Sequence, residues 1–121
     1  MQHSSRQVVE SATVAGVRFI IKRMSLGRRI ELAKRVNELS RKIEFLQAGG
    51  SEREQIEAVW LAGEIDAIYL RWGLDAIEGL HIDGQPAGVD ALVDFGPEDL
   101  AREALVAVKA EAGLSEDERK N

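Results

Sequence analysis

The residues of this sequence best able to do chemistry are two histidines and a group of acids. His3 lies near the N-terminus, and His81 lies in a stretch that we expect to be extended. Asp75, Glu78 and Asp83 lie close to the second histidine along the chain. Two carboxyl groups in different environments can act as an acid and a base, and histidine with carboxylates can bind a metal. These five residues are therefore the first candidates for a site.

Their surroundings favour a structural explanation. Asp83 begins an Asp-Gly pair, which is a strong signal for a tight turn, and a histidine at an exposed strand position needs no role beyond solvation. The sequence contains no Walker loop, no nucleophile elbow and no calcium-binding loop. It also has no cysteine to serve as a nucleophile or a zinc ligand. We therefore expect no enzymatic activity, no cofactor and no bound metal.

The composition indicates an ordinary soluble protein. With 121 residues, 45% of them hydrophobic and 31% charged, the chain can form one folded domain with a real core. The absence of cysteine suits a reducing cytoplasm. No segment approaches the roughly 20 apolar residues that span a bilayer, and the N-terminus lacks the apolar core of a signal peptide. We expect an intracellular protein that does not bind membranes.

The charge is distributed unevenly along the chain. Residues 1–50 carry a net charge of +6, whereas residues 51–121 carry −11. The basic half could bind nucleic acid through Arg28, Arg35 and Lys42, but few aromatic side chains accompany them to stack on bases. The alternative is that the two halves complement each other, within the fold or across a self-association interface. This second interpretation is favoured, and we expect no nucleic-acid partner.

The N-terminal region is rich in β-branched residues. Residues 7–14 and 17–24 form two such runs, separated by Ala15-Gly16, which predicts a β-hairpin with its turn at this pair. Phe19 and Ile21 share one face of the second run, so that face is expected to be covered.

A long helix is predicted next, over residues 26–47. Ser25 is its expected N-cap and Gly49-Gly50 its expected end. One stripe of apolar residues recurs at helical spacing: Leu32, Val36, Leu39, Ile43 and Leu46. Ile30 and Phe45 fall on the opposite side. Either the hairpin or a loop covers them, or they contact a partner.

A second helix, antiparallel to the first, is predicted from Ser51 to Trp72, with a capping box over residues 51–54. It has two apolar faces, so it is either central in the domain or shared with another subunit. One face contains Ile56, Val59, Trp60, Gly63, Ala67 and Leu70, and the other contains Leu61, Ile65, Ile68 and Trp72. The residues expected in the core are Val36, Leu39, Ile43, Trp60 and Leu70. The candidate partner-binding residues are Ile30, Phe45, Leu61, Ile65 and Trp72.

The remaining chain returns to a small sheet before two more helices. Gly73 is expected to end the second helix, Ile77–Ile82 to form a third strand, and Asp83-Gly84 to form a turn. Pro86 cannot donate to a ladder, so any return strand should be short. A short helix is expected within residues 88–96. The last helix should begin at Pro97 and end at Gly113, with its buried face formed by Leu100, Ala101, Ala104, Leu105 and Val108.

The predicted fold is a mostly helical α+β fold. An N-terminal β-hairpin and a short third strand pack with two long antiparallel helices and a C-terminal helix. We expect residues 1–6 to be a flexible leader, residues 7–113 to form a single α+β domain, and residues 114–121 to be a flexible C-terminal tail.

Three segments resemble the small tail assembly chaperones of long-tailed bacteriophages and prophages. They share an extended segment running into a helix, a Trp-containing segment before an Asp-Gly-Gln-Pro turn, a late Gly-Pro-Glu-Asp-Leu helix and a charged end. The segments are FIIKRMSLGRRIEL (residues 19–32), YLRWGLDAIEGLHIDGQPA (residues 69–87) and LVDFGPEDLAREALVAVKAEAGLSEDERKN (residues 92–121).

The resemblance implies a non-catalytic morphogenesis factor in the host cell cytoplasm during phage assembly. Such a protein binds the phage tape measure protein and helps to recruit the tail tube protein. It also implies that residues 114–121 could form the junction to a longer, frameshifted product, the alternative being an ordinary frayed terminus. Two other functions stay open: a structural tail or head-tail connection protein of the virion, and a small regulator that binds nucleic acid.

Overall fold

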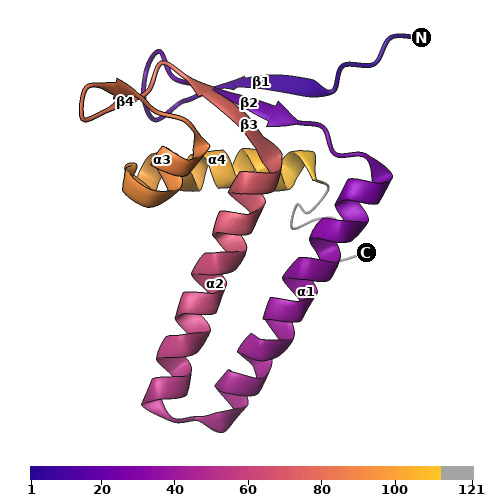
Figure 1. Cartoon of the computed structure of the whole chain (residues 1–121), viewed down its shortest axis with the longest axis vertical. Helices are drawn as coiled ribbons and strands as arrows, with labels where there is room; N and C mark the ends of the chain where they lie inside the picture. The colour runs from indigo at the N-terminus through magenta and orange to yellow at the C-terminus, as the bar shows by residue number, and fades with distance from the viewer. Residues whose placement is uncertain (113–121) are drawn as a thin grey trace. The chain divides into compact units, whose positions relative to one another are not determined.

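The computed structural model describes residues 1–112, which are mostly helical with a small antiparallel sheet (Figure 1). The elements are β1 (Arg6–Glu10), β2 (Arg18–Lys22), α1 (Leu26–Gly49), α2 (Glu52–Gly73), β3 (Leu74–Glu78), β4 (His81–Ile82), β5 (Gln85–Pro86), α3 (Val89–Phe95) and α4 (Glu98–Glu111). They confirm the expected α+β class. The predicted tail at residues 114–121 lies outside the described residues.

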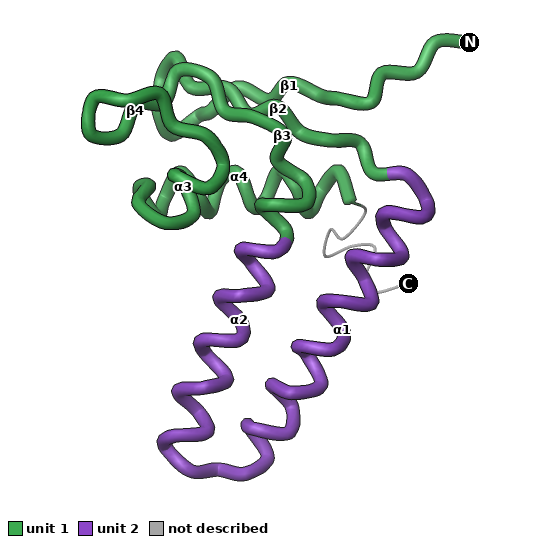
Figure 2. The backbone as a smooth tube through the Cα atoms, viewed as in Figure 1, with its two compact units in different colours: residues 1–24, 69–121 green, residues 25–68 purple. Residues whose placement is uncertain are grey.

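The chain divides into two compact units (Figure 2). Unit 1 contains residues 1–24 and the chain from residue 69 onward, and unit 2 contains residues 25–68. Unit 1 therefore holds the strands with α3 and α4, whereas unit 2 is a pair of helices. The division falls within residues 7–113, for which the sequence predicted a single domain.

The sheet of unit 1 has the strand order β1-β2-β3, with both pairs antiparallel. Phe19 of β2 lies between Val9 of β1 and Ile77 of β3. Phe19 and Ile21 are fully buried, as their shared face predicted, because α4 packs against β2 and α3 packs against β3. The other face of the sheet is more open, and Val8 is exposed there.

The connection between β1 and β2 is longer than the sequence indicated. The strands end at Glu10 and resume at Arg18, so the expected two-residue loop is wrong. The predicted turn at Ala15-Gly16 is nevertheless present: the N–H of Val17 donates to the carbonyl of Val14 at 3.3 Å, and Gly16 has a φ of 85°. The cause of the longer loop is a local turn built on Ser11, whose hydroxyl accepts hydrogen bonds from the backbone N–H groups of Thr13 (3.1 Å) and Val14 (2.9 Å). Serine side chains can divert the backbone from a ladder in this way.

The predicted strand Ile77–Ile82 is in fact divided. β3 begins at Leu74, directly after α2, and pairs with β2 as expected. Gly79 breaks it with a φ of 83° and brings its backbone against the carbonyl of Gly16, where a Cβ atom would collide. The chain then forms the separate β4–β5 hairpin, whose return strand is only two residues long, as Pro86 predicted.

The core of unit 1 is formed largely by α4 and the sheet. Leu100, Ala104 and Val108 of α4 are buried, as the spacing of its apolar face predicted. Leu92 of α3 is also buried. Pro97 is the N-cap of α4, so the helix begins at Glu98, one residue later than expected.

Unit 2 has the expected helix caps. The side chain of Ser25 accepts from the backbone N–H of Arg28 at 3.2 Å, and Gly50 adopts the left-handed conformation with a φ of 76°. Ser51 accepts from the backbone N–H of Glu54 at 3.1 Å and donates to its carboxylate at 2.6 Å. The tight connection makes α1 and α2 antiparallel neighbours (Figure 1).

We call the contact between α1 and α2 the helix seam, and few of its apolar side chains are fully buried. Leu32 and Ala58 are buried, but most of the other apolar residues expected along the seam are only half-buried. These half-buried residues are Val36, Leu39, Ile43 and Leu46 of α1, and Leu61, Ile65 and Ile68 of α2. Two helices alone bury one stripe each and leave the rest of their surfaces open.

Candidate functional site

The acids named as possible chemical groups have structural partners or lie at the surface. The carboxylate of Asp75 forms ion pairs with Arg6 (2.9 Å) and Lys22 (3.8 Å), which tie β3 to the other two strands. Glu78 is exposed at the end of β3. Within residues 1–112, no group of three or more His, Asp or Glu side chains could hold a metal ion.

Asp83 and Gly84 form the turn that the sequence predicted. Asp83 has a φ of 52° and Gly84 a φ of 78°, which are the two positive values that a type I′ hairpin turn requires. His81 lies on the adjoining strand and is exposed. The conformation of this hairpin explains the Asp-Gly pair without any reaction.

A carboxylate that sequence reasoning missed holds the β1–β2 loop to α4. Glu103 accepts hydrogen bonds from the Ser11 hydroxyl (2.5 Å) and from the backbone N–H groups of Ala12 (2.8 Å) and Thr13 (3.3 Å). Burial alone would raise its pKa, but these hydrogen bonds outweigh burial and hold the pKa of Glu103 below its ordinary value of 4.5. The contact joins residues about ninety positions apart, so no local pattern indicates it.

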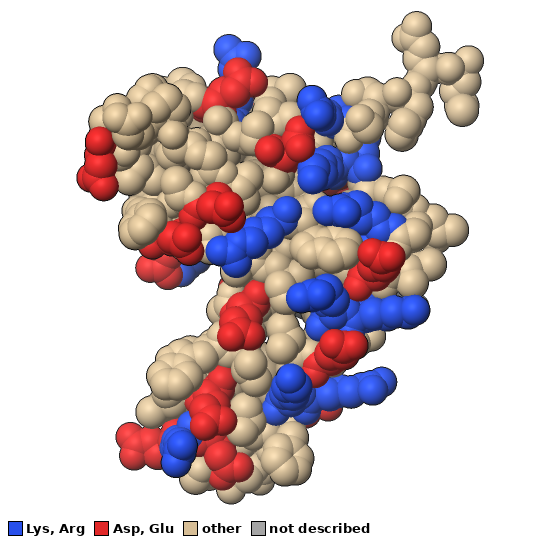
Figure 3. Space-filling model, viewed as in Figure 1, with Lys and Arg blue, Asp and Glu red and all other residues tan. Residues whose placement is uncertain are grey.

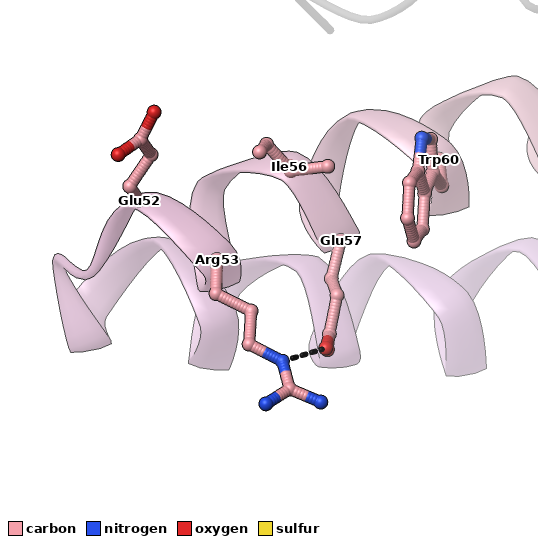
Figure 4. Close-up of a pocket in the computed structure, with 5 residues that line it drawn as sticks. All are labelled: Glu52, Arg53, Ile56, Glu57 and Trp60. Carbon is pink, nitrogen blue, oxygen red and sulfur yellow. Dashed lines mark ion pairs between the residues drawn. The ribbon is translucent and has the colours of Figure 1, made fainter.

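The outer surface of α2 exposes the apolar face that was expected to be inside. Trp60 is 66% exposed, so its assignment to the core is wrong, whereas Leu70, on the same predicted face, is buried in unit 1. Ile56 and Trp60 lie on successive turns and line a hollow of about 490 Å³, beside the Arg53–Glu57 ion pair (Figure 4). The helix thus presents apolar side chains within a charged border.

A second hollow, of about 410 Å³, lies between the two helices of unit 2. Phe45 of α1, 77% exposed, lines it together with Arg41 and Lys42 on the same helix. Glu57 of α2 borders this hollow and also the first one. The two hollows therefore meet at one residue, close to the end of the hairpin where α1 passes into α2.

The five predicted partner-binding residues separate into two groups. Ile30, 47% exposed, and Phe45 are accessible on α1. Leu61, Ile65 and Trp72 are half-buried, and Leu61 borders the second hollow. The roles of all five in partner binding stay predictions.

The choice of face on α2 could not be made from periodicity. Both faces have helical spacing and each contains a tryptophan, and Trp60 was the one expected in the core. Small residues do not distinguish them either, because the Trp60 face contains Gly63 and Ala67. In the structure Ala58 is buried on the side of Leu61 and Ile65, so that side meets α1. Trp60 lies away from that side.

Comparisons with known proteins assign this chain to no family. No family model, no curated protein and no solved structure matches this chain. Among residues 1–112, no helix is long and apolar enough to cross a membrane.

Proposed function

We propose that this protein is a non-catalytic phage tail assembly chaperone that binds the tape measure protein and helps to recruit the tail tube protein in the host cell cytoplasm. The proposal rests on the resemblance of residues 19–32, 69–87 and 92–121 to that family. It also rests on the kind of surface that unit 2 offers.

The observation that carries the proposal is the surplus of apolar side chains on unit 2. Leu26 and Ile30 are exposed on α1, one turn apart, and Val59 is exposed on α2. Neighbouring exposed apolar groups with a polar rim, such as Leu26 and Ile30, are typical of protein-binding sites, whereas single ones are normal on any surface. An amphipathic helix of a long helical client could cover such a surface with residues at i, i+3, i+4 and i+7.

The acidic residues that could take part in a reaction are held in structural contacts, which favours binding over catalysis. Asp75 is engaged by Arg6 and Lys22, and Glu103 is engaged by the β1–β2 loop. Asp83 serves a turn. These contacts give Asp75, Asp83 and Glu103 structural roles.

Co-expression with a candidate phage tape measure protein tests the function directly. We expect an affinity tag on this chain to retain the tape measure protein after a moderate-salt wash. Ile30→Asp should reduce the retained amount at least several-fold. Val106→Asp is the matched control, because Val106 is exposed on α4 of unit 1. No retention by the wild-type protein, or equal loss with both variants, would contradict the proposal.

A further inference from the structure

The two helices of unit 2 carry opposite charges. α1 has six Lys/Arg and three Glu, a net charge of +3. α2 has five Asp/Glu and two Arg, a net charge of −3. Figure 3 shows blue side chains gathered over α1 and red ones over the first half of α2. One side of the helical hairpin is therefore basic and the other acidic.

Exposed apolar side chains line the two hollows beside these charges. Phe45 and Trp60 are each more than three-fifths exposed. Within residues 1–112, neither Arg41 nor Lys42 forms an ion pair, although both border the hollow lined by Phe45. We call this area the tip surface, formed by Arg41, Lys42, Phe45, Ile56, Glu57 and Trp60. It has an apolar middle with a basic border on α1. Its border on α2 holds two acids, Glu52 and Glu57, of which Glu57 is paired with Arg53 at 3.6 Å.

We propose that the tip surface is the interface of a homodimer in which α1 of one copy packs against α2 of the other. In a two-fold interface, residue i meets residue j and residue j meets residue i. A surface with one basic and one acidic border is complementary to itself under that operation. Arg41 and Lys42 of each copy then face Glu57 of the other, while Phe45 and Trp60 lose their contact with water.

The charges also select the direction of the symmetry axis. When two hairpins lie face to face, an axis parallel to the helices brings α1 opposite α2 of the other copy. An axis across the helices brings α1 opposite α1, which places like charges together. The parallel axis therefore forms an antiparallel four-helix bundle, the usual way in which helical hairpins bury their remaining apolar surface.

A second copy fits this surface better than nucleic acid does. A phosphate backbone would be attracted to Arg41 and Lys42 but repelled by Glu52 and Glu57 on the neighbouring helix. The proposal goes beyond the chaperone function, because Leu26 and Ile30, offered above to the client, do not line the two hollows. Dimerisation is measured without any client, so the two proposals fail separately.

The first experiment measures the mass of the purified full chain by sedimentation or light scattering across a concentration series. We expect the mass to rise to twice the monomer value of 13.3 kDa. Phe45→Ser should shift the midpoint to at least tenfold higher concentration. Phe95→Ser is the matched control, since Phe95 is equally exposed, at 76%, but belongs to unit 1, and it should leave the midpoint unchanged.

The second experiment exchanges the charges of the two borders. One variant carries Arg41→Glu and Lys42→Glu, and the other carries Glu52→Lys and Glu57→Lys. Each alone should be monomeric, because its altered border meets a like charge in a second copy. Their equimolar mixture should recover the dimer, since both borders become complementary again. Recovery also shows that each variant is folded.

Three results would overturn the proposal. The first is a wild-type chain that stays at the monomer mass throughout the concentration series. The second is a dimer that Phe95→Ser weakens as much as Phe45→Ser does. The third is a pair of charge variants that remain dimeric alone, or that fail to associate when mixed although each has the circular dichroism spectrum of the wild type.

Discussion

The α-carbon of Gly73, the last residue of α2, lies against the side chain of Val108 on α4, with no room for a Cβ atom. Alanine is normally the better helix residue by about 1 kcal/mol. At position 73 we expect the opposite. Gly73→Ala should destabilise the protein by roughly 1–3 kcal/mol in urea unfolding, because it overpacks a buried contact.

Two variants make this prediction specific. Gly63 is also helical, but nothing lies within 4 Å of the place that a Cβ atom would take there, so Gly63→Ala should be neutral or slightly stabilising. Val108→Ala should recover much of the loss when it is combined with Gly73→Ala, since it removes the clashing methyl groups. If Gly73→Ala is as stable as the wild type, Val108 and α4 move aside for the added methyl group without cost, and the prediction is wrong.

The hydrogen bonds to Glu103 predict a pH dependence of stability. The pKa of Glu103 is lowered in the folded state, so its contribution is fully present above its ordinary, unfolded-state pKa of 4.5 and is lost as the pH falls through the folded pKa. The difference in unfolding free energy between the wild type and Glu103→Gln should therefore shrink as the pH is lowered. Urea titrations at several pH values measure it, and a constant difference would argue against the anchoring role of this carboxylate.

Local sequence signals predicted much of the architecture because they act through local physics. The serine at position 25 caps α1, the glycine at position 50 ends it, and the alternation around Phe19 and Ile21 identifies the covered face of β2. Asp83-Gly84 likewise forms its turn through its own backbone conformation, which does not depend on distant parts of the chain. In each case the responsible atoms are within a few residues of one another.

The errors arose where distant parts of the chain decide the conformation. The β1–β2 loop depends on Glu103, far along the chain, and the end of β3 depends on the approach of Gly79 to Gly16. The orientation of Trp60 depends on which face of α2 meets α1. The candidate surface was therefore predicted only in part: Phe45 and Ile30 are accessible, but the exposed aromatic of α2 was assigned to the core.

The two units should respond differently to the loss of a leucine. Leu100 is fully buried in unit 1, so Leu100→Ala should cost roughly 2–5 kcal/mol of unfolding free energy. Leu39 was expected in the core but is only half-buried on α1. Leu39→Ala should therefore cost less than about 2 kcal/mol, below the usual range for a buried leucine. Equal losses of unfolding free energy for Leu100→Ala and Leu39→Ala in denaturant melts would contradict the incomplete burial of side chains at the helix seam.

Substitutions of Asp83 test whether the role of this residue is to form the β4–β5 turn. Asp83→Asn should change stability by less than about 0.5 kcal/mol, since asparagine also accepts a positive φ. Asp83→Val should cost roughly 1–2 kcal/mol, because a β-branched residue is strained at the observed φ of 52°. His81→Ala should resemble the asparagine variant. A metal that copurifies with the protein and is lost in His81→Ala would overturn the structural interpretation of both residues.

The position of unit 2 in the chain makes its length easy to change. The chain leaves the sheet at the end of β2 and returns at β3, its antiparallel neighbour, so the sheet holds these two strands roughly 5 Å apart whatever lies between them. Such neighbours can be joined by as few as two residues, and lengthening a connection adds little loop-closure entropy. Both helices can therefore be lengthened or shortened in step, by whole turns, and the same sheet is kept with a longer or shorter helical hairpin.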